Sequence, residues 1–176
     1  MKGFRETIET ALGEFIERHT GVKAAFKPSK AAHLATSAFY TSDAEGIAAR
    51  LFANASDCTL LNAPLLSNVR AENGWLLFFF TADAIDAYAN TLPPAEEPDD
   101  FFFARRLWIA YRHADAQTPD DPALLDGFFA VLFGAPNAEQ RWLSAPRRHD
   151  GNARAALERR LSRMAKILLW ERRKTP

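Results

Sequence analysis

Eight basic side chains near the C-terminal end have a spacing suited to contacts with phosphate groups. Arg159, Arg163 and Lys166 stand at i, i+4 and i+7 and share one face of an expected helix, with Arg160 beside them. Lysines and arginines that contact phosphates release counterions, so a cationic helix face is typical of proteins that bind polyanions. Taken singly, each residue also fits a solvated helix face or a partner for the acidic residues 92–126. The cluster comprises Arg154, Arg159, Arg160, Arg163, Lys166, Arg172, Arg173 and Lys174.

The charge of the whole chain is balanced, but its distribution is uneven. The 176 residues carry 22 Lys and Arg against 22 Asp and Glu, a formal net charge of zero. Residues 1–91 have a balance of −2, residues 92–140 of −6, and residues 141–176 of +8. An electropositive end on a neutral chain is compatible with a polyanionic partner but does not by itself demand one.

Residues that commonly carry catalysis or bind metals are dispersed along the chain. A single cysteine, Cys58, excludes an internal disulfide and a cysteine-based zinc cluster. Paired aspartates at 99–100 and 120–121 precede expected helices, where N-capping explains them. The sequence contains no phosphate-binding glycine loop, nucleophile elbow or paired-histidine zinc motif. We therefore predict no catalytic residue, no metal site and no cofactor. The histidines fall in four separate segments, at His19, His33, His113 and His149.

The first half is organised around a hairpin over residues 65–81. Its first strand alternates apolar and polar residues, as does a strand with one buried face. Asn73-Gly74 tolerates the positive φ angles of a two-residue type I′ turn. The return strand, Trp75 to Phe80, is apolar almost throughout, which predicts a central strand covered on both faces. Thr81 is then expected to cap a helix.

Helices and a short strand are expected before the hairpin. Helical periodicity over residues 3–19 ends at Gly21, and alternation through residues 22–26 predicts a strand that stops at Pro28. A second helix is expected from Ala31 to Tyr40. A third should follow the capping box at residues 42–45, with Ile47, Leu51 and Phe52 on its apolar side. Residues 1–91 are thus predicted to form an α+β domain with an antiparallel sheet.

A proline-rich, acidic segment at residues 92–99 is interpreted as a linker. Beyond it, residues 100–176 show only helical patterns, which predicts an all-α bundle with no strand after Pro98. Its helices are expected from residue 99 or 100 to His113, from Asp121-Pro122 to Gly134, from Asn137 to Leu143, and from Ala153 to the C-terminal region. The last helix carries an apolar stripe at Leu157, Leu161, Met164, Ala165 and Leu168.

Three segments of the first half resemble the N-terminal domain of arginyl-tRNA synthetase. The run V-x-A-x-x-G-W-L-x-F-F-F-T-x-D, Val69 to Asp83, is similar to the hairpin of that domain. Phe26 to Phe39 and Gly46 to Leu51 are similar to the segments that precede it, although the Gly-Asp pair of the family is replaced around Ala32-His33. The resemblance covers residues 1–91 and implies that the aromatic ring of Trp75 contacts tRNA. A ring that simply packs on the sheet explains this residue equally well. Leu77 stands where the family has an asparagine, so base reading through that side chain is not carried over.

The second half resembles another part of the same class of enzymes. The run F-x-x-R-R-L-W-I-A-Y-R, Phe102 to Arg112, is similar to the first helix of the anticodon-binding bundle known for its D-A-L-R signature, and the final helix occupies the position of the closing helix. No literal D-A-L-R occurs. The signatures H-I-G-H and K-M-S-K of the catalytic domain are also absent from the sequence.

These observations lead to one hypothesis and one alternative. The chain is expected to be a non-catalytic relative of arginyl-tRNA synthetase that binds tRNA or another structured RNA, through Trp75 and the cationic final helix. The alternative is a protein–protein adaptor or homodimer that has lost RNA binding, which the zero net charge and Leu77 favour. No signal-like segment or membrane-length apolar run is present in the sequence, so a cytoplasmic location is expected.

Overall fold

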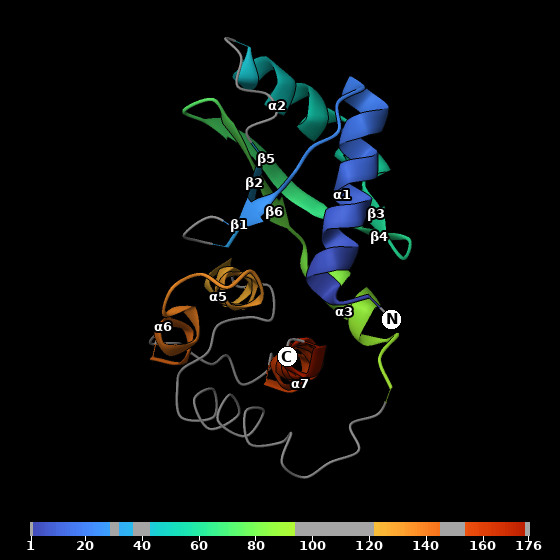
Figure 1. The fold of residues 1–176 in the computed structure, drawn as a ribbon. Coiled ribbons are helices and arrows are strands. Elements are labelled where there is room, and N and C mark those ends of the chain that lie inside the picture. The colour runs from blue at the N-terminus through green and yellow to red at the C-terminus, as the bar shows by residue number, and fades with distance from the viewer. Residues whose placement is uncertain (1, 29–31, 37–42, 94–121, 145–153, 175–176) are drawn as a thin grey trace.

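The computed structural model describes residues 2–28, 32–36, 43–93, 122–144 and 154–174. Its elements are helices and antiparallel strands, which places the fold in the α+β class. Figure 1 shows α1 beside the main sheet, and α5, α6 and α7 together below it. In chain order the elements are α1 (Phe4–Thr20), β1 (Lys27–Pro28), β2 (Leu34–Thr36), α2 (Ala44–Ala53), the 3-10 turn η1 (Ala55–Asp57), β3 (Thr59–Leu60), β4 (Ala63–Pro64), β5 (Leu66–Glu72), β6 (Trp75–Phe80), α3 (Ala82–Ala89), α5 (Pro122–Leu132), α6 (Ala138–Ser144) and α7 (Arg154–Lys174).

The main sheet has the strand order β1-β2-β6-β5, and every neighbouring pair is antiparallel. β6 is therefore an inner strand, as its apolar sequence predicted. The hairpin between β5 and β6 turns at Asn73 and Gly74, whose φ angles are 50° and 81°. Both angles lie in the left-handed region that a type I′ turn requires, so the predicted turn is confirmed. β3 and β4 form a separate two-stranded sheet.

The two faces of the main sheet have different environments. Leu76, Phe78 and Phe80 of β6 belong to the main hydrophobic core, with the buried residues of α1 and α2. Leu77 lies on the opposite face, where it is buried but does not belong to that core. Because successive side chains of a strand alternate between faces, Trp75 and Phe79 share the face of Leu77, and both are only half-buried. The prediction that β6 is covered on both faces therefore holds for one face and only partly for the other.

The segment predicted as a second helix, from Ala31 to Tyr40, contains a strand instead. Leu34, Ala35 and Thr36 form β2, and all three are buried. β2 pairs with β6, so its backbone groups complete hydrogen bonds along an edge that β6 would otherwise leave unpaired. This pairing overrides the helical propensity of the surrounding alanines, which is weak compared with tertiary contacts.

Smaller corrections concern the neighbouring elements. Strand β1 begins at Lys27, so residues 22–26 precede it rather than form it. Helix α2 begins at Ala44 with Asp43 at the N-cap, and the Asp43 side chain makes no capping hydrogen bond. Ser42, the first residue of the predicted capping box, lies outside the described residues. Phe52, placed on the apolar side of this helix by its spacing, is 48% exposed.

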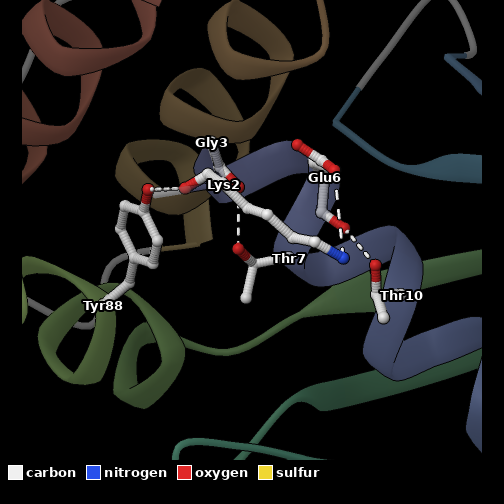
Figure 2. Close-up of polar contacts among 6 residues, drawn as sticks. All are labelled: Lys2, Gly3, Glu6, Thr7, Thr10 and Tyr88. Carbon is white, nitrogen blue, oxygen red and sulfur yellow. Dashed lines mark hydrogen bonds and ion pairs between the residues drawn. The ribbon is translucent and has the colours of Figure 1, made fainter.

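Helix α1 confirms the expected limits, and its first turn is tied to α3. It ends at Gly21, whose φ of 72° closes the helix in the left-handed conformation. The Tyr88 hydroxyl of α3 donates a hydrogen bond of 2.7 Å to the Lys2 carbonyl oxygen (Figure 2). The Thr7 hydroxyl donates to the Gly3 carbonyl at 2.8 Å, and this carbonyl also accepts from the Thr7 amide in the first turn of the helix. Thr81 caps α3 as predicted, because its hydroxyl accepts from the Ala84 amide.

The described residues after position 121 form three helices whose buried side chains join the core of the first half. The Phe80 ring of β6 lies 5.5 Å from the Phe129 ring of α5, measured between centroids. Phe4 of α1 stacks on Tyr88 at 4.5 Å and lies 6.3 Å from Phe128. One hydrophobic cluster therefore extends from α1 through the sheet to α5 and α7. The helix predicted for residues 99–113 lies outside the described residues.

Candidate nucleic-acid interface

The cationic helix predicted to meet phosphates is α7, and its central cations bind the protein itself. The Arg160 guanidinium lies 3.3 Å from the Asp86 carboxylate of α3, and that of Arg163 lies 3.0 Å from it. The Arg160 side chain is only 10% exposed. Lys166 donates to the carbonyl oxygens of Ala89 and Leu92 at 3.4 Å and 3.0 Å. A cation in this position adds a donor to carbonyls at the C-terminal end of α3 and complements the helix dipole.

The remaining predicted cations of α7 occupy different positions. Arg172 forms an ion pair with Glu139 of α6. Arg159 and Arg173 are exposed, and the Arg154 side chain is outside the described part of the structure. Spacing placed Arg159, Arg163 and Lys166 on a single phosphate-binding face. The structure instead directs Arg163 and Lys166 to α3, so these two residues hold α7 against the first half of the chain.

A second group of cations lies on the sheet face that carries Trp75. We call this surface the outer face and define it by Lys27, His33, Ala35, Arg70, Glu72, Trp75, Leu77 and Phe79. Its register follows from strand pairing, since Lys27 faces Ala35, Ala35 faces Leu77, and Leu77 faces Arg70 across the four strands. Directly opposed residues share a face, so these four form one row. Trp75 and Phe79 stand two residues on either side of Leu77 along β6.

Both half-buried aromatic rings of the outer face carry a basic side chain. The Lys27 ammonium lies over the Trp75 ring, 3.9 Å from its centroid. The Arg70 guanidinium lies over the Phe79 ring at 4.4 Å. The ring of His33 is 5.0 Å from the ring of Phe79. Such contacts are cation–π interactions, which hold the charge at the surface without neutralising it.

The electrostatics of the outer face differ from those of α7. Among the residues described by the structure, Lys27 and Arg70 form no ion pair with a carboxylate, although both are exposed. Burial and the nearby Arg70 lower the pKa of His33, while Glu72 acts to raise it. Glu72 is directly opposite Trp75 across the hairpin. At the Trp75 end the charges of Lys27 and Glu72 offset each other, whereas at the Phe79 end Arg70 provides a positive charge.

Sequence reasoning identified Trp75 but missed Lys27, Arg70 and Phe79. Arg70 has a polar position in an alternating strand, and Phe79 belongs to a continuous apolar run, so neither residue is distinctive alone. The available signal was the period-2 alternation of β6, which separates residues 75, 77 and 79 from residues 76, 78 and 80. Lys27 belongs to β1 and His33 directly precedes β2. They reach the outer face because β1 pairs with β2 and β2 pairs with β6, which are tertiary features.

Other chemistry-bearing residues take structural positions. Cys58 is buried, and burial raises the pKa of its thiol to about 12, so it is protonated at neutral pH. His19 lies 3.2 Å from the Asp57 carboxylate and against the ring of Phe15. Within the described ranges, no three His, Cys, Asp or Glu side chains are grouped as metal ligands would be. The paired aspartates at 99–100 and 120–121 lie outside those ranges.

In comparisons with known proteins, no family model, curated protein or solved structure matches the chain significantly. None of the helices in the described part of the chain is both long and apolar enough to span a bilayer.

Proposed function

We propose that the protein is a non-catalytic RNA-binding module that binds tRNA or another structured RNA through the outer face of its sheet. The observation that carries this proposal is the half-exposed Trp75 ring with the Lys27 ammonium 3.9 Å from its centroid. Aromatic rings beside cations on a sheet surface are a common means of binding unpaired bases, since the ring stacks on the base and the cation takes the phosphate. Zinc, cofactor and catalytic roles have no part in it.

The contact between Lys27 and Trp75 is weak enough to be exchanged for a base. A cation–π contact at an exposed site contributes about 0.5–1 kcal/mol. Stacking of a base on an aromatic side chain contributes about 1–3 kcal/mol. A base that takes the place of the ammonium therefore gains free energy, and it leaves Lys27 available for a phosphate of the same strand.

The sequence resemblance to arginyl-tRNA synthetase supports the same proposal. It assigns an RNA contact to the aromatic position now occupied by Trp75, and the outer face supplies that contact with cations. The resemblance also supports an anticodon-binding type of helical bundle for residues 100–176, in a protein located in the cytoplasm. In this proposal Arg159, Arg172 and Arg173, with Arg154, provide a second area of contact with the RNA. Arg160, Arg163 and Lys166 instead position α7.

A titration of the purified protein with total tRNA, at about 50 and 200 mM salt, tests the proposal. We expect binding at low salt that weakens steeply at the higher concentration, because phosphate contacts release counterions. Trp75→Ala should weaken binding with little change in the salt slope, since stacking releases few ions. Phe52→Ala is the matched control, as it removes another exposed aromatic ring on α2. Absence of salt-sensitive binding by the unmodified protein would refute the proposal.

The alternative function, a protein–protein adaptor or homodimer, is favoured by two exposed apolar side chains. Phe52 is 48% exposed on α2, and Leu61 is 53% exposed in the turn between β3 and β4. Apolar residues at the surface are enriched at docking sites only when they form a patch, and isolated ones are ordinary. Sedimentation equilibrium decides between the two functions. A concentration-dependent dimer abolished by Phe52→Ser, together with no RNA binding, would establish the alternative.

A further inference from the structure

We propose that Arg70 and His33 form a phosphate subsite beside Phe79, which binds the backbone of an RNA strand whose base stacks at Trp75. This inference rests on the proposed function and adds to it the way in which the RNA strand lies along the outer face. The base would lie at the Trp75 end of the outer face and the phosphate at the Phe79 end.

The geometry separates two nucleotide positions. Trp75 and Phe79 are four residues apart on the same face of β6, which corresponds to about 13 Å along a strand. The two rings are therefore too far apart to sandwich one base. An RNA strand that runs along β6 on the outer face would contact Trp75 first and then Phe79 with Arg70 and His33. The buried Leu77 lies between these two positions.

The two ends carry different sets of charges. Arg70 has no carboxylate within ion-pair distance among the described residues, whereas Arg160, Arg163 and Arg172 of α7 each have one. At the Trp75 end, the charge of Lys27 is offset by that of Glu72, which stands opposite the ring. At the Phe79 end, Arg70 supplies the positive charge, so an anion is drawn to this end.

The donors at this end suit a phosphate. The Arg70 guanidinium carbon lies 4.4 Å from the centre of the Phe79 ring, and the N–H groups of a guanidinium form a planar fork that can bind phosphate oxygens in pairs. Contact with the ring limits the rotamers of Arg70, so less conformational entropy is lost on binding. His33, which directly precedes β2, adds a donor against the same ring.

The inclusion of His33 makes the subsite sensitive to pH. The groups that face its ring are Arg70 and Glu72 on β5 and the uncharged Phe79 on β6, while Lys27 on β1 lies toward Trp75. Burial and Arg70 lower the pKa of His33 below its ordinary value of 6.5, so the ring is neutral at pH 7 in the free protein. A bound phosphate favours the protonated ring, and RNA affinity should therefore rise as the pH falls and the ring takes up a proton.

Fluorescence anisotropy with a labelled single-stranded RNA tests the subsite. Arg70→Gln should weaken binding about tenfold and flatten the log–log salt dependence by about 0.7. Arg50→Gln removes an exposed arginine of α2 and should change neither quantity. His33→Gln should abolish the gain in affinity between about pH 8 and pH 5.5. Glu72→Gln should strengthen binding, since it removes the repelling carboxylate.

Several outcomes would overturn the subsite. If Arg70→Gln affects binding no more than Arg50→Gln, or if His33→Gln leaves the pH dependence unchanged, the assignment is wrong. Competition by a nucleoside monophosphate as effective as by the RNA strand would contradict a backbone phosphate as the ligand. Thermal unfolding of each variant checks that the fold is intact, and Arg70→Lys, which keeps the charge, should recover part of the affinity.

The same experiments separate failure of the subsite from failure of the proposed function. If the unmodified protein binds RNA and Trp75→Ala weakens that binding, but the Arg70 and His33 variants behave as the unmodified protein does, only the subsite is refuted. If the unmodified protein binds no RNA, both fail.

Discussion

At the scale of single residues, Asp86 determines what two of the arginines of α7 do. Its carboxylate lies within 3.3 Å of Arg160 and 3.0 Å of Arg163, and Arg160 is almost fully buried. A guanidinium in such a position needs an anionic partner, because burial without one has a large desolvation cost. The apparent phosphate-binding face of α7 is thus in large part a contact with α3.

Replacement of Asp86 by Asn should lower the free energy of unfolding by about 2 kcal/mol. The variant leaves Arg160 buried without its carboxylate and weakens the attachment of α7 to α3. Urea denaturation followed by far-UV circular dichroism measures the change. Asp83→Asn, on an exposed residue in the first turn of the same helix, is the matched control and should lower stability by no more than about 1 kcal/mol. Equal effects of the two substitutions would argue against the ionic contact.

The buried thiol of Cys58 should make the free energy of unfolding depend on pH in the alkaline range. Its thiol has an ordinary pKa of 9.0 when exposed and a pKa raised to about 12 when buried, so above pH 9 the unfolded chain releases a proton that the folded chain retains. The stabilisation is fully present below pH 9 and is lost progressively toward pH 12. From about pH 8 to about pH 10 the free energy of unfolding should fall by about 1 kcal/mol through this thiol. Cys58→Ala should show a smaller decline over the same interval, and an unchanged decline would exclude Cys58 as its source.

At the scale of elements, two helical glycines have opposite packing requirements. A Cβ added at Gly127 of α5 would come within 1.9 Å of the Trp142 side chain of α6. A Cβ at Gly13 of α1 would meet only the Phe26 ring, at an ordinary contact distance of 3.8 Å. Helix propensity favours alanine at both positions, but the close approach of α6 to α5 depends on the missing side chain of Gly127.

Gly13→Ala and Gly127→Ala should therefore change stability in opposite directions. The first should raise the free energy of unfolding by about 0.5–1 kcal/mol, the usual difference in a helix interior. The second should lower it by about 1–3 kcal/mol, because Trp142 must move. Chemical denaturation of the two variants in parallel gives the comparison. A stabilising Gly127→Ala would mean that α5 and α6 are not packed as closely as described.

At the scale of the whole molecule, the two halves of the chain share a core. Phe4, Tyr88, Phe128 and Phe129 form a continuous set of ring contacts across them. The Glu171 carboxylate of α7 also accepts a hydrogen bond from the Phe4 amide at the start of α1. The N-terminus of the first helix and the last turns of the final helix are therefore joined, although the sequence pattern suggests two self-contained units separated by residues 92–99.

We expect the full chain to unfold in one cooperative transition. Reactivity of the Cys58 thiol at mild alkaline pH reports on the first half, and fluorescence of the tryptophans, two of which lie in α6 and α7, reports mainly on the second. Both probes should give the same midpoint in urea, because separation of the halves would expose the shared aromatic core. Two midpoints that differ clearly would show that residues 1–91 and 100–176 unfold independently.

The amino-acid sequence by itself determined the local elements that have strong backbone signals. Asn73-Gly74 required positive φ angles, Gly21 and Gly134 ended their helices in the left-handed conformation, and Thr81 capped α3. These features depend on the conformational freedom of one residue and on its immediate neighbours. They can therefore be predicted without knowledge of the fold. The α+β class followed from the same information.

Only the tertiary structure decided which residues meet. β2 is a strand because β6 offers it an unpaired edge, although its sequence resembles the start of a helix. Arg163 and Lys166 bind α3. Lys27 lies over Trp75 and Arg70 over Phe79, and neither forms an ion pair with a carboxylate among the described residues. Charge and aromatic character belong to the single residue. Which side chain it contacts depends on strand register and on packing between segments that are far apart in the chain. For this reason the spacing of the basic residues in the sequence could not show that Arg163 and Lys166 contact α3, or that Lys27 and Arg70 lie beside aromatic rings on one face of the sheet.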